Sequence, residues 1–193
     1  LPWRRTSDPY AIWVSEAMLQ QTRVETVKEY WPRFLERFPT ATALAEAEEE
    51  AVLEAWSGLG YYRRARSLQA AARVIASEHQ GVFPRDLGAA LDLPGVGPYT
   101  AGAVVSIAYD VPAPLVDGNV ERVFARLFGM EGVRASGPLG RACWAAASFF
   151  VERLEGAVRP SVWNQALMEL GALVCTPRAP RCDECPLAEE CVA

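Results

Sequence analysis

Four cysteines near the end of the chain have the spacing of a metal site. Cys175, Cys182, Cys185 and Cys191 fall within the last nineteen residues and are separated by six, two and five residues. Thiolates this close can hold either a tetrahedral zinc ion or an iron–sulfur cluster, and the spacing alone slightly favours zinc. Such clustering is unlike a disulfide framework and indicates a reducing, cytosolic setting. The fifth cysteine, Cys143, lies on an apolar helix face and is expected in the core.

Glu16 and Asp117 are the two carboxylates whose positions could serve acid catalysis. Glu16 is expected in the middle of a helix with Ile12 and Leu19 about one turn away, so desolvation should raise its pKa and make it a general acid near neutral pH. A partly exposed helix glutamate is the commoner alternative. Asp117 stands where a helix begins, and from these residues alone a plain N-cap is the favoured explanation.

The glycine turn LPGVGP, residues 93–98, predicts a tight connection between two helices. Gly95 and Gly97 can adopt positive φ, and exposed N–H groups followed by a helix N-terminus form an anion site. As a helix-hairpin-helix, this turn would hold a DNA phosphate without reading sequence. A structural corner between helices is the alternative that these residues leave open.

Composition places the chain among globular proteins. Its 193 residues are about half apolar, and no apolar run approaches the roughly 20 residues that span a bilayer. The net charge of −5 argues weakly against nucleic acid, but eighteen of the nineteen cations are arginines, which suit phosphate contacts, and YYRRAR (61–66) is a basic, aromatic cluster. The only lysine is Lys28. The single histidine, His79, lies near a helix end, so histidine-based catalysis has no support.

Helical periodicity runs through nearly the whole chain and predicts an all-α fold of about ten helices. Asp8 and Pro9 predict the N-cap and first position of a helix that continues to a break before Pro32. Prolines and a glycine at 110–118 mark a boundary between two packed lobes. The other helices are expected at 40–60 (one or two), 61–79, 99–108, 118–128, 138–154 and 161–174.

With these features assembled, the chain resembles the helix-hairpin-helix DNA glycosylase superfamily, and within it the MutY adenine glycosylases. The matching segments run in family order over almost the whole chain. They are LPWR (1–4), SEAMLQQT (15–22), GLGYYRRAR (58–66), LPGVGPYTAGA (93–103), VDGNVERV (116–123), NQALMELGALVCT (164–176) and the four-cysteine tail.

The resemblance implies an architecture and a cofactor. It implies a six-helix barrel lobe (1–111) that contains the hairpin (about 86–108), a cluster lobe (112–193), and an active site in the cleft between them. It also implies that the four cysteines hold a 4Fe–4S cluster rather than zinc. Typical members continue into a separate domain that recognises 8-oxoguanine. Because the chain stops two residues after Cys191, we expect that domain to be absent.

The activity that the resemblance implies is hydrolytic removal of adenine mispaired with 8-oxoguanine or guanine. Glu16 matches the acid that protonates adenine at N7, and Asp117 matches the carboxylate that stabilises the oxocarbenium-like sugar. Tyr99 and Asn119 match further catalytic positions. The remaining matches are Trp3, Arg4, Leu19 and Gln165 in the adenine pocket, Gln20 in substrate or DNA binding, Gln21 and Tyr61 as wedges in the base stack, and Gly95 and Gly97 at a phosphate.

Two other functions remain as alternatives. A thymine glycosylase acting on T·G mismatches is the nearest, although the paired glutamines of MLQQT and the segment NQALMELGA favour adenine. A non-catalytic DNA-binding module is the other, but it would not require both Glu16 and Asp117. A lyase would need a lysine for its Schiff base, and Tyr99 occupies that lysine's usual place, so we expect a monofunctional glycosylase. The expected partner is double-stranded DNA with an A·8-oxoguanine or A·G mispair, bound by a monomer in the bacterial cytoplasm at the nucleoid and not at a membrane.

Overall fold

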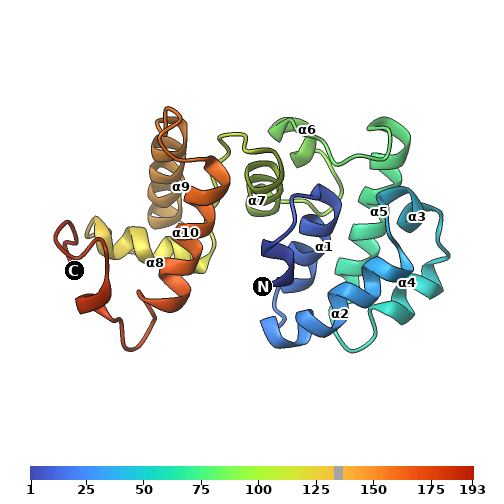
Figure 1. The fold of residues 1–193 in the computed structure, drawn as a ribbon, viewed down its shortest axis with the longest axis horizontal. Coiled ribbons are helices and arrows are strands. Elements are labelled where there is room, and N and C mark those ends of the chain that lie inside the picture. The colour runs from blue at the N-terminus through green and yellow to red at the C-terminus, as the bar shows by residue number, and fades with distance from the viewer. Residues whose placement is uncertain (133–136) are drawn as a thin grey trace. The chain divides into compact units, whose positions relative to one another are not determined.

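The structure, a computed structural model, describes residues 1–132 and 137–193. Over these residues it has ten α-helices, two short 3₁₀-helices and no strand (Figure 1), which confirms the all-α fold. The chain divides into two compact units, Leu1–Tyr109 and Asp110–Ala193. Among the described residues, none of the helices combines the length and apolar character needed to cross a membrane.

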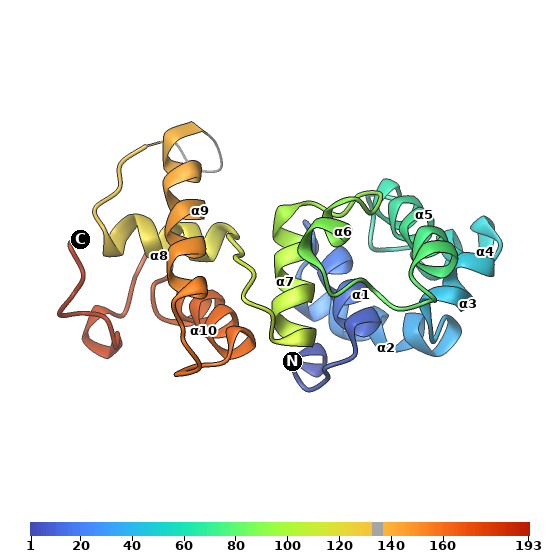
Figure 2. The same cartoon turned by 90° about the horizontal axis from the view of Figure 1, so that it is seen from above.

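The first unit is built around α1 (Pro9–Leu19), which is buried on every side. The helix starts where the sequence predicts: Asp8 accepts a hydrogen bond from the backbone N of Tyr10 at 3.0 Å, and Pro9 takes the first helical position. Every residue from 10 to 18 is buried, because α7 (Pro98–Tyr109) packs along α1 (Figure 2) and two other helices also contact it. The other elements of this unit are η1 (Pro2–Arg4), α2 (Val24–Arg37), α3 (Ala41–Glu46), α4 (Glu49–Ala55), α5 (Arg63–Glu78) and α6 (Leu87–Leu91).

The break between the first two helices was predicted at the wrong place. We expected a helix that runs on to Pro32, but α1 ends at Leu19 and α2 carries Pro32 inside it. Gln21, between them, has a φ of 57°, in the left-handed region that terminates helices. The chain therefore turns at Gln21, and α2 accommodates a proline that cannot donate a backbone hydrogen bond.

The glycine turn connects α6 to α7, as predicted. Gly95 has a φ of 74°, and a Cβ placed on it would lie 2.5 Å from the Cβ of Ser67, so both backbone and space require glycine there. Gly97, which could also adopt a positive φ, does not do so. Gly97 precedes Pro98, whose ring favours extended backbone in the residue before it.

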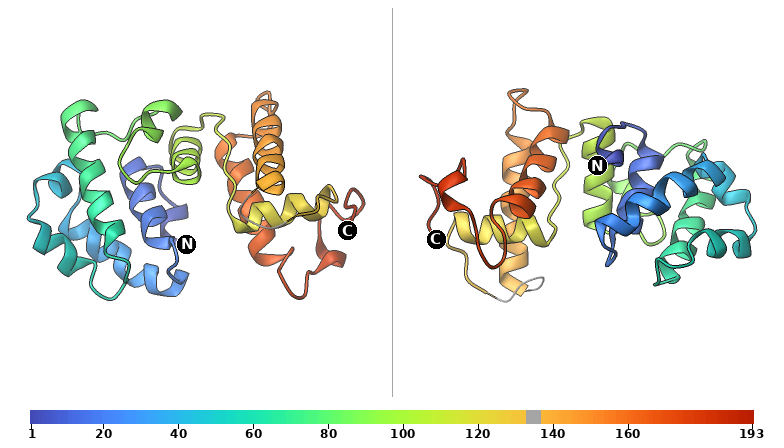
Figure 3. Two further views of the ribbon diagram at one scale, coloured as in Figure 1. Left: turned by 180° about the vertical axis from the view of Figure 1, so that it is seen from behind. Right: turned by 60° about the horizontal axis from the view of Figure 1, so that its bottom comes forward.

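The second unit packs three helices against a group of aromatic rings. The rings of Phe128 and Phe150 stack with their centroids 5.8 Å apart, and Trp163 contacts Phe150 at 5.9 Å. Cys143 is fully buried, which confirms its place in the core. The elements, yellow through red in Figure 3, are α8 (Gly118–Leu127), α9 (Gly137–Glu152), α10 (Pro160–Leu173) and η2 (Cys182–Glu184).

Candidate functional site

The carboxyl of Glu16 is buried in the first unit and bonded to Tyr99. Glu16 lies in the middle of α1 and is 3% exposed. Tyr99 is the second residue of α7, directly after the glycine turn, and its hydroxyl donates a hydrogen bond to Oε2 of Glu16 at 2.8 Å. A carboxyl held away from bulk water beside a hydroxyl is suited to proton transfer. The structure therefore brings two of the predicted catalytic side chains together.

Asp117 is the N-cap of α8, and three hydrogen bonds fix its carboxylate. Its Oδ1 accepts from the backbone N of Asn119 at 2.9 Å and of Val120 at 2.8 Å, and its Oδ2 accepts from Nδ2 of Asn119 at 2.8 Å. A helix N-terminus also favours a negative charge. The capping role is thereby confirmed, and it leaves both carboxylate oxygens in defined positions.

Arg122 joins Asn119 to the chain at the first cysteine of the tail. Its Nη2 donates to Oδ1 of Asn119 at 2.8 Å and to the carbonyl of Gly171 at 2.6 Å, and its Nε donates to the carbonyl of Cys175 at 2.7 Å. A Cβ on Gly171 would lie 2.6 Å from the Cβ of Asn119, so α8 and α10 need glycine at this contact. The sequence reasoning gave Arg122 no role, although it lies one helical turn after Asn119 on the same face of α8.

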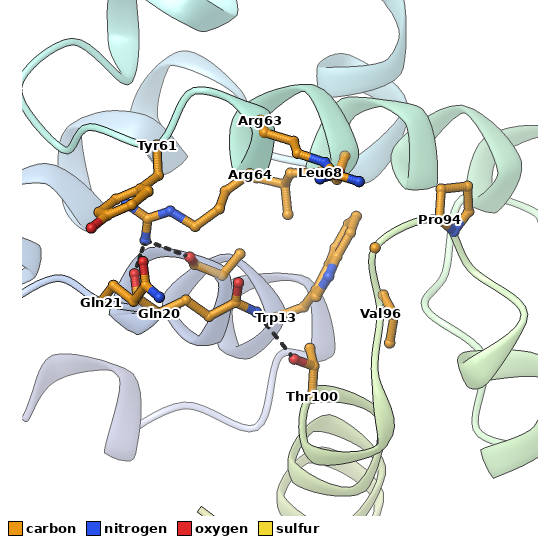
Figure 4. A pocket seen from close by; sticks show the side chains of 13 residues that line it. Trp13, Gln20, Gln21, Tyr61, Arg63, Arg64, Leu68, Pro94, Val96 and Thr100 are labelled. Atoms are coloured by element: carbon orange, nitrogen blue, oxygen red, sulfur yellow. Dashed lines mark hydrogen bonds between the residues drawn. The ribbon is translucent and has the colours of Figure 1, made fainter. Parts of the chain in front are cut away.

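A cavity of about 730 Å³ in the first unit is lined by four of the residues predicted to contact substrate or DNA, namely Gln20, Gln21, Tyr61 and Gly95. The glycine turn forms one wall, and the turns that carry Gln21 and Tyr61 form another (Figure 4). Gln21 is exposed, and Tyr61 is 62% exposed. The lining residues are Trp13, Ala17, Gln20, Gln21, Tyr61, Arg63, Arg64, Ser67, Leu68, Pro94, Gly95, Val96 and Thr100.

The predicted adenine-pocket residues of the N-terminal segment and α1 are buried to different extents. Trp3 is 2% exposed and packs edge-on against Trp31, with the ring centroids 6.0 Å apart. Its Nε1 is buried and has no acceptor among the described residues. Arg4 and Leu19 are partly buried. An indole N–H without a partner is costly in the interior and is suited to an acceptor on a ligand.

The two remaining predicted glutamines already hold intramolecular partners. Nε2 of Gln20 donates to Oγ1 of Thr100 at 3.4 Å, which ties the end of α1 to α7. Nε2 of Gln165 donates to the carbonyl of Ser161, one turn earlier on α10, at 3.0 Å. The amide of Gln165 is therefore engaged by its own helix in this structure.

The four cysteines of the tail line one cavity of about 210 Å³ in the second unit. All are free thiols, and no group of three or more His, Cys, Asp or Glu side chains in the described residues is close enough to hold a single metal ion. Nη1 of Arg126 lies 3.3 Å from Sγ of Cys175 and lines the same cavity. A donor set of four thiols around one cavity, with a cation beside it, fits an iron–sulfur cluster.

The chain matches two described protein families. Residues 14–147 match the HhH-GPD superfamily of base excision DNA repair proteins, and residues 175–191 match the iron–sulfur binding domain of endonuclease III. The second match identifies the cofactor as a 4Fe–4S cluster, as the resemblance implied. It corrects the slight preference for zinc, which arose because zinc and the cluster both take four cysteine ligands at similar spacing.

Individual relatives match nearly the whole chain. It is 47% identical over 186 residues to the adenine DNA glycosylase of Schizosaccharomyces pombe, an overlap of 95% of this chain and 40% of that protein. It is 32% identical to a thermostable thymine-DNA glycosylase of known structure, with a TM-score of 0.86 over 100% of this chain and 87% of that one. It is 26% identical to endonuclease III in a trapped covalent intermediate with DNA, with a TM-score of 0.74 over 96% and 84% of the two chains. The chain thus spans less than half the length of the yeast relative.

Proposed function

Because this chain belongs to the HhH-GPD superfamily of base excision DNA repair proteins, we propose that it is the catalytic region of a DNA glycosylase that removes adenine mispaired with 8-oxoguanine or guanine. The observation that carries the proposal is the partly buried hydrogen bond between Tyr99 and Glu16. This contact gives the base-excision fold a carboxylic acid. It also places the phenol of Tyr99 where a lyase of the superfamily carries its lysine. The similarity to adenine DNA glycosylases supports adenine as the base.

Glu16 is the general acid in this proposal. A base must leave the duplex before its glycosidic bond can be reached, at a cost of a few kcal/mol. Adenine is a poor leaving group until it is protonated, and Glu16 donates a proton to N7. The bond between C1′ and N9 then breaks, its electron pair passes to the purine, and positive charge develops on the sugar.

Asp117 is the carboxylate that stabilises the charged sugar, as in glycoside hydrolysis. Its three hydrogen bonds support this role because they hold the carboxylate in place before substrate arrives. Water bonds to C1′ and returns a proton to Glu16, so the products are free adenine and an abasic site.

Water is the final nucleophile in this proposal because the one lysine of the sequence does not stand at the position of Tyr99. Lys28, the only lysine, lies on α2 and forms an ion pair with Glu25 at 2.8 Å. A lyase needs an amine that can form a Schiff base with the opened sugar. We therefore expect no enzyme–DNA adduct above background when the reaction is treated with borohydride. Efficient trapping would contradict a hydrolytic mechanism.

DNA binding in this proposal rests on the glycine turn and the exposed side chains around the 730 Å³ cavity. The left-handed Gly95 and the following helix N-terminus are suited to a phosphate. Gln21 and Tyr61 are the residues that enter the base stack. The cluster, when bound, cross-links the four cysteines and orders the tail.

Single-turnover excision tests the proposed function. Duplexes with A opposite 8-oxoguanine, A opposite G, and T opposite G are incubated with excess holoprotein, and base release is followed. We expect release of adenine from the first two duplexes only. A thymine glycosylase is the second candidate, supported by the likeness to a thymine-DNA glycosylase structure, and it predicts release from the third duplex instead.

A further inference from the structure

Gln21 and Tyr61 share an uncommon backbone conformation. Their φ angles are 57° and 49°, in the left-handed region that residues other than glycine rarely occupy. Gln21 lies between α1 and α2, and Tyr61 lies just before α5, so forty residues separate them. Both are exposed on one cavity (Figure 4). Two strained residues that project into one site indicate that something else in the fold holds them there.

One end of the guanidinium of Arg64 holds the turn that contains Gln21. Nη1 lies within hydrogen-bonding distance of the carbonyl oxygens of Ala17 at 3.1 Å, of Met18 at 2.8 Å and of Gln20. Nη2 donates to Oγ1 of Thr22 at 3.0 Å. These contacts satisfy carbonyls that the end of α1 leaves without helical partners, and they bracket Gln21 on both sides.

The same guanidinium holds the turn that contains Tyr61. Nη2 also donates to the carbonyl oxygens of Leu59 at 3.0 Å and of Gly60 at 3.1 Å, directly before Tyr61. The Cζ of Arg64 lies 5.5 Å from the ring centroid of Tyr61 and 5.4 Å from that of Trp56, within cation–π range. The ring of Tyr61 is thus oriented by the cation that fixes its backbone.

The contacts of Arg64 are those of an internal brace rather than of a phosphate ligand. Its Nη1 and Nη2 are engaged by backbone and side-chain acceptors of the two turns, and burial is the main reason that its pKa lies below the usual value. Its neighbour Arg63 is exposed and lines the same cavity, so the cationic surface does not depend on Arg64. A lysine could not replace the brace, since its ammonium lacks the planar fork that reaches both turns.

We propose that Arg64 is a positioning residue that holds Gln21 and Tyr61 in their left-handed turns, so that the two side chains enter the base stack as a preorganised pair. This inference rests on the proposed function, in which both side chains act on a mispaired duplex. Separating stacked bases is costly, and wedges that are already ordered lose little entropy when they insert. Arg64 therefore contributes to the preference for mispaired over matched DNA and little to general DNA affinity.

The experiment compares R64K with R66K, a matched control on the same helix. Arg66 is exposed, lies outside the cavity lining and forms an ion pair with Glu49 at 2.9 Å. Hydrogen exchange of the holoprotein without DNA is measured first. In R64K the amides of Thr22 and Leu59 should exchange about tenfold faster, while those in the middle of α1 are unchanged. R66K should match the wild type.

Binding to duplexes is measured next, with A·8-oxoguanine and matched A·T pairs over a series of salt concentrations. R64K should lose about tenfold of the wild-type ratio of affinities for the mispaired over the matched duplex. The salt dependence is measured in R64Q, which removes the charge, and it should equal that of the wild type because no phosphate contact is removed. A salt slope of R64Q reduced by about one unit would make Arg64 a phosphate ligand and overturn the proposal. Unchanged exchange at both turns would also overturn it.

A milder variant covers the case in which R64K fails to fold. Thr22→Val removes one acceptor of the brace and should speed exchange at Thr22 and Leu59 in the same direction by a smaller factor. No change in either amide would contradict the brace. If the wild type does not prefer the mispaired duplex, the proposed function fails, whereas the exchange results still decide whether Arg64 joins the two turns.

Discussion

The hydroxyl of Tyr99 and the carboxyl of Glu16 meet at 2.8 Å although 83 residues separate them. α7 begins at Pro98, directly after the glycine turn, so Tyr99 lies within the first turn of that helix. In the proposed function, the helix that begins at the phosphate-binding hairpin therefore also carries the hydroxyl that positions Glu16 on α1.

Replacing Glu16 with glutamine tests the acid directly. The amide keeps the size of the side chain but cannot supply the proton, so we expect adenine release to fall by about 10²–10⁴-fold. Affinity for the mispaired duplex should change by less than about threefold, because the shape of the site is kept. Single-turnover excision and duplex binding measure the two quantities. The control is E25Q, at an exposed residue paired with Lys28, which should keep the wild-type rate. Near-normal release by E16Q would place the acid elsewhere.

The two glycines of the hairpin are expected to respond differently to alanine. G95A forces alanine into the left-handed region and against Ser67, at a cost of about 1–2 kcal/mol for the backbone alone. It should lower the melting temperature by about 2–8 °C and weaken DNA binding. G97A meets no other atom within 4 Å and should stay within about 0.5 kcal/mol of the wild type. Thermal unfolding of the pair checks this, and equal melting temperatures would be the contrary result.

Features that depend on residues close together in the chain could be predicted from the sequence. Features that depend on residues far apart in the chain could not. Asp8 and Asp117 were predictable as caps because a cap is a contact between residues two or three apart. The turn at Gln21 was not, because nothing in MLQQT marks it, and the guanidinium that braces it lies 44 residues beyond Gln20. Backbone carbonyls are identical in every residue, so an arginine that binds them leaves no complementary residue type to find. The role of Arg122 could not be predicted for the same reason, because it bonds the backbone carbonyl of Cys175, 53 residues away.

Arg122 gives a third prediction. R122K should slow adenine release by about tenfold or more, because an ammonium cannot bond Asn119, Gly171 and Cys175 together, and each unsatisfied group costs about 1–3 kcal/mol. The hydrogen bonds from the backbone of Asn119 and Val120 to Asp117 remain in R122K. Slower adenine release would therefore come from the side chain of Asn119, which loses its bond to Arg122. Excision is measured per cluster, with the cluster counted by its visible absorbance. The control is R153K, at an exposed arginine directly after α9 that bonds the carbonyl of Phe149 near the end of that helix. Equal rates for R122K and R153K would remove Arg122 from the site.

The stability of the protein should decline in alkaline solution through Tyr10. Its hydroxyl donates to the carbonyl of Phe38 at 2.8 Å, and burial, with a smaller contribution from Asp8, raises the pKa of Tyr10 far above its usual value. The unfolded chain releases this proton near pH 10 and the folded chain keeps it. The contribution of Tyr10 is therefore complete below about pH 10 and falls by about 1.4 kcal/mol per pH unit above it.

Denaturant unfolding of the wild type and Y10F at about pH 8 to 11 measures this decline. The slope of unfolding free energy against pH above 10 should be shallower in Y10F, which has one titrating group fewer. Tyr109, whose pKa burial also raises, titrates in both proteins and cancels in the comparison. Parallel curves would show that Tyr10 ionises with equal ease in both states.

A helix buried on all sides is an unfavourable place for a carboxyl, and α1 nevertheless carries Glu16 there. An apolar residue of similar size at this position would give a more stable protein, because a buried polar group costs free energy even when it has a partner. In the proposed function, Glu16 is therefore a residue that lowers the stability of the folded chain in exchange for the acid that base release requires.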